Sequence, residues 1–336
     1  MKYLKFSLIG AAVFAGGLGS ANAALTAFQT YVGNYGVSTD GWGSTTQAGV
    51  ISASVPAGAI VQAAYLYTSV FSFSTAQTYG GSLDGTAVNF STPLGLNSSS
   101  SGLQAFRSDV TSILKPRIDG GVGGVYNFNI TESNRGQDGA ALVVVYSLAS
   151  LATSTVGILD GFALTTGSTT AINFARPLSP SAPGFFAEMR LGIGFSADGG
   201  PACRGTAQTS TVTVNGTRIT NNAGCNDDSA DESEANGNLI TVGGFDDPFS
   251  PLLPSTGADK ERYNLINYIA EGSSAIEVVT RNASNDDNIF LAVFHVSGVA
   301  GIDAPPPPPN NEVPLPGTLA LLGLGLLGMR AKRFLR

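Results

Sequence analysis

Charged residues are scarce in this chain of 336 residues: Asp, Glu, Lys and Arg make up 12% of it, about half of the roughly 25% typical of soluble domains. Histidine occurs once and cysteine twice. A zinc site of the usual Cys/His kind therefore has few ligands to draw on. A helical bundle needs many Ala, Glu, Lys and Leu residues, so the shortage of charge also argues against that class of fold.

Glycine is abundant instead, with 43 residues, and hydrophobic residues reach 43%. That apolar content is too high for a disordered chain. Short strand-like segments recur every 8 to 12 residues with turn signals between them, a spacing typical of β-sandwiches and jelly rolls. We therefore expect a mainly β, antiparallel fold with few short helices, built as two packed sandwich halves, residues 24–180 and 181–303.

Several segments carry the strand prediction. Residues 59–70 and 140–146 are apolar on both faces, as in buried strands. Residues 124–131 alternate between polar and apolar side chains, as in a strand with one exposed face. Asn215-Gly216 favours a type I′ hairpin turn. Residues 259–269 form the best helix candidate in this half of the chain.

The N-terminal end is typical of a secretory signal peptide spanning residues 1–23. Lys2 and Lys5 provide the positive start, and residues 8–18 form a short apolar stretch. Ala21 and Ala23 form a small-x-small cleavage site. The alternative is a membrane anchor, although the apolar stretch is short for that purpose.

The C-terminal end has three parts. Residues 304–312 contain a polyproline spacer, and the motif Val313-Pro314-Leu315-Pro316 follows it. Residues 317–329 are apolar, although a full membrane span needs about 20 residues. The chain then ends in the basic residues Arg330, Lys332, Arg333 and Arg336, which fit a cytoplasmic stop.

This order of motif, short apolar helix and basic end resembles the PEP-CTERM sorting signal of Gram-negative bacteria, here over residues 313–336. Leu315 stands where that signal usually has Glu. The resemblance implies a precursor tethered transiently to the inner membrane, processing by an exosortase, and association with exopolysaccharide. An ordinary C-terminal membrane anchor is the alternative. Segments such as GGFDDPFS and NDDNIFLAVF also resemble a family of secreted PEP-CTERM proteins, which implies location rather than activity.

The region between the two ends is strongly acidic. Residues 24–312 contain 24 acidic and 11 basic side chains, which gives a net charge of −13. Such a surface repels nucleic-acid phosphates, so we expect no nucleic-acid partner and regard divalent cations as more natural ligands.

Cys203 and Cys225 lie 22 positions apart. In an exported chain an even pair of cysteines predicts a disulfide that closes a local loop. A metal site is the alternative, but no further histidine or cysteine lies nearby.

Acidic pairs recur in the second half of the chain. Calcium binds six to eight hard oxygen ligands, which carboxylates on neighbouring loops can supply. The alternative is that these residues are solvated turn and capping residues. The candidate ligands of such a Ca²⁺ ion are Asp227, Asp228, Asp246, Asp247, Asp286 and Asp287.

Catalytic motifs are weak. His295 is the single histidine and lies in an apolar strand-like segment, and the Gly-x-Ser-x-Gly elbow of hydrolases is missing. Trp42, with Tyr31 and Tyr35 nearby, is either part of the core or a platform for sugars. We therefore expect a non-enzymatic structural or adhesion protein of the cell surface or extracellular matrix. The alternative is a glycoside hydrolase or glycan-binding module on a jelly-roll scaffold.

Overall fold

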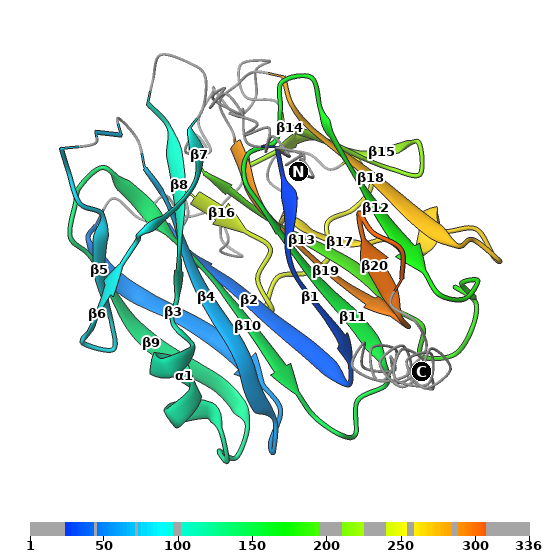
Figure 1. Ribbon diagram of the computed structural model, residues 1–336, viewed down its shortest axis with the longest axis horizontal. Helices are drawn as coiled ribbons and strands as arrows, with labels where there is room; N and C mark the ends of the chain where they lie inside the picture. Colours follow the sequence, from blue (N-terminus) through cyan, green and yellow to red (C-terminus); the bar gives the residue numbers. More distant parts are fainter. Residues whose placement is uncertain are drawn as a thin grey trace, which may run out of the picture.

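The computed structural model describes residues 24–43, 46–70, 73–74, 76–96, 102–194, 210–224, 240–253, 259–283 and 288–306. This part of the chain consists mostly of antiparallel β-strands with one α-helix (Figure 1), so the predicted fold class is confirmed. None of the helices described is long and apolar enough to cross a membrane.

The strands form four sheets, numbered I to IV here. Sheet I consists of β3 (Ala48–Val55), β9 (Gly124–Glu132), β5 (Gly80–Leu83) and β6 (Thr86–Asn89). Sheet II consists of β2 (Tyr35–Trp42), β10 (Gln137–Ser147), β4 (Ile60–Val70), β8 (Gln104–Asp109) and β7 (Thr92–Leu96). Sheet III consists of β1 (Thr26–Gly33), β11 (Ser154–Asp160), β19 (Asn288–Ser297), β13 (Ala187–Gly194) and β16 (Ile240–Val242), with β17 (Arg262–Asn264) also paired to β13. Sheet IV consists of β15 (Thr217–Ala223), β14 (Ser210–Val214), β18 (Ala275–Asn282), β12 (Ser168–Phe174) and β20 (Ala300–Ile302).

Three hydrophobic cores fill the spaces between the four sheets. Each core is shared by two consecutive sheets, so the sheets stack in the order I, II, III, IV. One core joins sheets I and II through residues such as Phe128 and Leu142. A second joins sheets II and III through residues such as Val143 and Ile158. A third joins sheets III and IV, with Leu159 and Ile276 among its members. The molecule is therefore two sandwiches packed back to back, with sheets II and III in the middle.

The chain passes between the two sandwiches at two places. It leaves β1 at Gly33, whose φ of 145° is reserved for glycine, and enters β2 in sheet II two residues later. It returns from β10 to β11 over residues 148–153. Strands β11 and β12, which the predicted boundary at residue 180 assigns to the first half, are hydrogen-bonded to strands of the second half.

Local sequence signals explain several elements. Asn215 and Gly216 have φ angles of 46° and 80° and join β14 to β15, as the type I′ prediction requires. The helix predicted over residues 259–269 is wrong, because this segment contains β17 and a single 3₁₀ turn, Ile266–Tyr268. Within the described ranges the α-helix is α1 (Thr111–Ile118), which packs against β4 and buries Leu114 and Ile118.

Candidate functional site

Many of the residues predicted from sequence lie outside the part that the structure describes. They are the cleavage-site residues Ala21 and Ala23, the cysteines Cys203 and Cys225, the acids Asp227, Asp228, Asp286 and Asp287, the motif Val313 to Pro316, and the basic residues Arg330, Lys332, Arg333 and Arg336. The structure therefore tests none of their predicted roles.

Asp246 and Asp247 lie between β16 and β17. They are the two predicted Ca²⁺ ligands that the structure describes. Asp247 is buried, and its Oδ2 accepts a hydrogen bond of 2.6 Å from the Gly244 N–H. The structure adds Asp40 of β2, whose Oδ1 lies near the same glycine. Burial raises the pKa of Asp40 to about 8 and the pKa of Asp247 to about 7. Within the described residues, no group of three or more His, Cys, Asp or Glu is arranged to hold a metal ion.

Asp259 and Glu261 are both buried, and their oxygens accept hydrogen bonds inside the fold. Asp259 accepts from the hydroxyls of Thr220, Ser250 and Tyr263. Glu261 accepts from the Thr241 hydroxyl at 2.7 Å and from the Gly224 N–H at 3.0 Å. Burial raises the pKa of both carboxyls. These acids therefore stabilise the strands around β17 and are not exposed loop ligands.

The side chains of His295 and Trp42 both pack within the fold. The Nε2 of His295 lies 3.2 Å from the Tyr35 carbonyl oxygen and 3.3 Å from the Ser154 hydroxyl, and burial lowers the pKa of the imidazole to about 4. Trp42 is 5% exposed and belongs to the core between sheets I and II. The platform interpretation of Trp42 is thus wrong, because its ring packs inside the sandwich.

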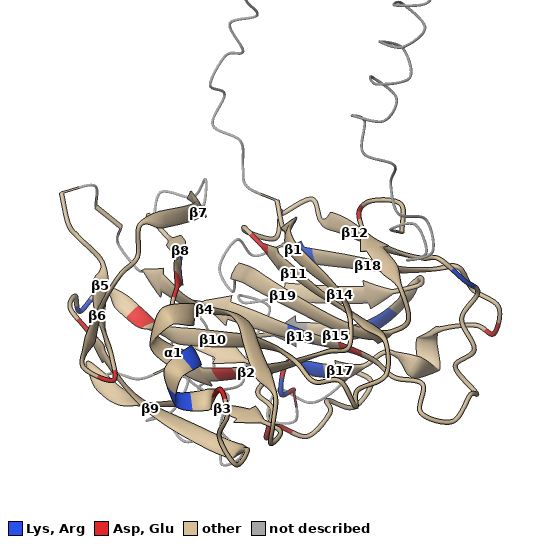
Figure 2. Ribbon diagram, turned by 60° about the horizontal axis from the view of Figure 1, so that its bottom comes forward, with Lys and Arg blue, Asp and Glu red and all other residues tan. Residues whose placement is uncertain are grey.

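An open groove of about 530 Å³ lies at one edge of the junction between the two sandwiches. Sheet III contributes the ends of β1 and β11, and sheet II contributes β7 and β8. Figure 2 shows β7 and β8 on one side and β1 and β11 on the other. The groove is lined by Ala24, Thr26, Ala27, Phe28, Thr92, Pro93, Leu94, Arg107, Asp160 and Gly161.

The groove contains one ion pair, between Arg107 of β8 and Asp160 of β11, which links the two sandwiches. Only 15% of the Arg107 side chain and 10% of the Asp160 side chain are exposed. The Tyr67 hydroxyl of β4 also donates to Asp160 Oδ2, at 3.3 Å. Burial raises the pKa of Asp160, while Arg107 opposes that shift.

Aromatic side chains hold Arg107 in place. Its guanidinium carbon lies 3.3 Å from the centre of the Phe28 ring, a close cation–π contact. The Phe28 ring in turn meets Tyr65 edge-on, with ring centres 5.0 Å apart. Sequence reasoning missed this site, because Arg107 and Asp160 are 53 positions apart and neither belongs to a motif.

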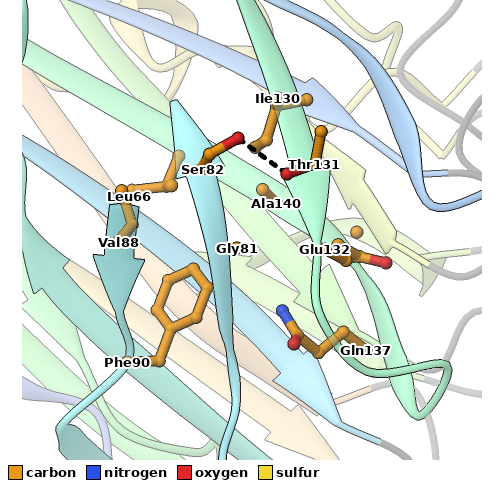
Figure 3. Close-up of a pocket in the computed structure, with 11 residues that line it drawn as sticks. Leu66, Gly81, Ser82, Val88, Phe90, Ile130, Thr131, Glu132, Gln137 and Ala140 are labelled. Carbon is orange, nitrogen blue, oxygen red and sulfur yellow. Dashed lines mark hydrogen bonds between the residues drawn. The ribbon is translucent and has the colours of Figure 1, made fainter. Parts of the chain in front are cut away.

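A second, enclosed cavity lies between sheets I and II (Figure 3) and holds about 10 Å³, the space of one water molecule. Glu132 and Gln137 are among its lining residues. The Glu132 Oε1 and the Gln137 Nε2 atoms are buried without a hydrogen-bond partner among the described residues. Burial raises the pKa of Glu132 to about 8. The cavity is too small for a substrate.

Comparison with solved structures gives distant matches. The protein BuGH86 in complex with neoagarooctaose is 10% identical with a TM-score of 0.22, and the match covers 85% of this chain and 35% of that one. A β-porphyranase of glycoside hydrolase family 86 from Bacteroides plebeius is 10% identical with a TM-score of 0.21, over 84% and 38% of the two chains. PNGF-II is 9% identical with a TM-score of 0.24, over 79% and 66%. At these values the likeness supports no statement about activity.

No curated protein matches this chain significantly. The family model of the PEP-CTERM protein-sorting motif does match, over residues 312–333. That range contains the motif Val313 to Pro316, the apolar stretch and three of the four basic residues named above. This chain therefore carries a PEP-CTERM sorting signal, which marks it as an exported protein that an exosortase of the inner membrane processes in Gram-negative bacteria.

Proposed function

We propose that this protein is a non-enzymatic structural or adhesion component of the cell surface or extracellular matrix, associated there with exopolysaccharide. The sorting signal at residues 312–333 carries the proposal, because it supplies a route to the outside. In this proposal residues 1–23 direct export, and residues 313–336 tether the precursor to the inner membrane until an exosortase cuts near Val313 to Pro316.

The architecture of residues 24–306 supports a mechanical role. The described residues form a body four sheets thick with three hydrophobic cores. The net charge of −13 over residues 24–312 keeps copies of the body apart in solution. In this proposal the acidic loops, including Asp246 and Asp247, gain rigidity when they bind Ca²⁺.

The groove favours binding over hydrolysis. A glycoside hydrolase uses two carboxylates on either side of the scissile bond. Asp160 is the one carboxylate among the described residues that line the groove, and it is paired with Arg107. The second candidate function, a glycan-binding module, is compatible with this arrangement.

Deletion of residues 313–336 tests the proposal in the native host. We expect the full chain to leave the inner membrane with its tail removed, and the truncated chain to miss the cell surface and matrix. Intact mass and cell fractionation measure both results. Leu315→Glu, which creates the usual motif, is the matched control and retains sorting. Unchanged sorting of the truncated chain contradicts the proposal.

A further inference from the structure

We propose that two copies of this protein associate through the free edge of β1, with β1 of one copy paired antiparallel to β1 of the other. A free strand edge presents N–H and C=O groups that can pair with a further strand. β1 is such an edge, because it lies at the end of sheet III and pairs with β11 on one side and with no described strand on the other. This inference goes beyond the proposed function, since it assigns self-association to a particular surface.

The hydrogen bonds of β11 identify which groups of β1 face outward. In an antiparallel sheet each residue directs its N–H and C=O to the same neighbouring strand, and successive residues alternate between the two neighbours. The Gly161 N–H donates to β19, and the Thr153 carbonyl accepts from the turn that follows β19. Odd-numbered residues of β11 therefore bond to β19. Thr30 and Val32 lie opposite two of these residues, so their own N–H and C=O groups point to the free edge.

The other edges of the described sheets are covered, short or interrupted by proline. On β3 the N–H groups of Ser52 and Ser54 donate to side chains of β2. The carbonyls of Thr39 on β2 and Ile219 on β15 accept N–H groups from the segment between β16 and β17. β7 contains Pro93, which has no N–H, and β6, β16, β17 and β20 have only three or four residues. Among the described strands, β1 is thus the long edge that is open to another strand.

The distribution of charge favours a second copy of β1 as the partner. The net charge of −13 over residues 24–312 opposes contact between copies over most of the surface. β1 itself contains no charged residue, so two copies can pair along it without placing like charges directly opposite one another. Removal of residues 1–23 leaves an α-amino group on Ala24, and antiparallel pairing places the two amino groups at opposite ends of the paired segment.

The space beside β1 admits another strand. The groove of about 530 Å³ borders its first half, where Thr26, Ala27 and Phe28 line it. Thr30, in the middle of the strand, is exposed. A contact in which each copy uses the same strand has two-fold symmetry and closes after two copies. Because the other described edges are covered, short or interrupted, we expect a dimer and no larger polymer.

Proline at an outward-facing N–H tests the edge without removing a bond to β11. Thr30→Pro and Val32→Pro each delete a donor that faces the free edge, where edge strands tolerate proline. Thr30→Val is the matched control, because valine keeps the N–H and nearly the same side-chain size. Thr30→Lys is an independent test, because it introduces the kind of charge that protects natural edge strands from pairing. The melting temperature of each variant shows whether it folds.

Sedimentation velocity of the mature protein from its native host measures the association, at about 10 μM to 1 mM to include weak dimers. We expect a monomer–dimer equilibrium that shifts toward the dimer at higher salt, because salt screens the net negative charge. Thr30→Pro, Val32→Pro and Thr30→Lys should weaken it about tenfold or more, and Thr30→Val should leave it unchanged. Amide hydrogen exchange at Thr30 and Val32 should slow as the dimer forms, whereas Tyr31, which faces β11, should not change.

Four results would overturn the inference: the protein stays monomeric throughout, larger polymers form, the proline and lysine variants associate like the unchanged protein, or the slowed exchange lies on another strand. A monomeric protein that binds a strand of a different protein at β1 counts as the first of these. The sorting proposal is tested separately by the deletion of residues 313–336, so either proposal can fail while the other stands.

Discussion

The two central sheets are buried on both faces, whereas the two outer sheets are buried on one face. Strands of sheets II and III have a core on each side, and β11 is buried at every position from Ser154 to Asp160. Strands of sheets I and IV have a core on one side only, and β9 alternates between exposed and buried residues. Burial on both faces requires continuous apolar sequence, whereas burial on one face requires alternation.

The same contrast applies to charge. On the central sheets, Arg107 of β8 forms an ion pair with Asp160 of β11 across the junction between the two sandwiches. At the outer sheet I, the Arg117–Asp84 pair connects α1 to the β5–β6 turn, and 45% of the arginine side chain is exposed. Water screens an exposed pair and barely reaches a buried one. The two pairs should therefore differ in their contribution to stability.

The largest expected effect follows from this difference. Arg107→Leu leaves Asp160 buried without its partner, which should lower the free energy of unfolding by about 3 to 5 kcal/mol. The matched change Arg117→Leu removes an exposed pair and should cost about 1 kcal/mol or less. Urea denaturation measures both values.

A double variant shows where the cost of Arg107→Leu arises. If the unpaired carboxylate is the cause, Arg107→Leu with Asp160→Leu should recover much of the lost stability. Equal losses for Arg107→Leu and Arg117→Leu would mean that the central pair is no more buried in solution than the outer one.

The second prediction concerns packing on the two kinds of strand. On β11, Ile158 and Leu159 face different cores, so Ile158→Ala and Leu159→Ala should each cost about 2 to 5 kcal/mol. On β3, Ile51→Ala should cost a similar amount, but Val50→Ala, at a side chain 50% exposed, should change stability by about 0.5 kcal/mol or less.

Chemical denaturation of these four variants checks the pattern. The four-layer stack is supported if the free energy of unfolding falls strongly for both variants on β11 but strongly only for Ile51→Ala, and not for Val50→Ala, on β3. A small loss at Ile158 would mean that the two sandwiches are not packed against each other through sheets II and III.

Much of this organisation can be predicted from the sequence, because a strand buried on both faces has a continuous run of apolar residues. The run from Ala140 to Tyr146 predicts a doubly buried strand, and β10 is one. Asn215-Gly216 predicts its turn because both residues tolerate positive φ. By contrast, β1 and β2 lie in a Gly-rich stretch with little periodicity, and their pairing with distant strands decides their conformation.

The sequence-based errors have a common physical cause. A helix was expected over residues 259–269, but Asp259 and Glu261 point inward and accept hydrogen bonds from hydroxyls of β15 and β16 and from Ser250. These partners lie 9 to 39 positions away along the chain and leave no helical or strand pattern in the local sequence. The groove was unpredictable for the same reason, since its ion pair joins two strands from different sheets.

The last expected effect compares an acid between sheets I and II with one between sheets II and III by their response to pH. Glu132, between sheets I and II, has an unpartnered Oε1 and a pKa raised to about 8, compared with 4.5 in an unfolded chain. The folded chain keeps this proton at pH values where the unfolded chain has released it. Glu132 therefore stabilises the fold fully below pH 4.5 and loses that contribution as the pH rises to about 8.

We expect the melting temperature to fall by several degrees between pH 5 and pH 8.5, and Glu132→Gln to reduce that fall, because glutamine cannot release a proton. Asp160→Asn is the central comparison. It leaves Arg107 buried without a counter-charge, so it should lower the melting temperature at both pH values. Thermal denaturation at the two pH values separates these effects. A wild-type slope retained in Glu132→Gln would assign the pH response to other buried acids, of which Asp40 is the foremost because its pKa is also raised to about 8.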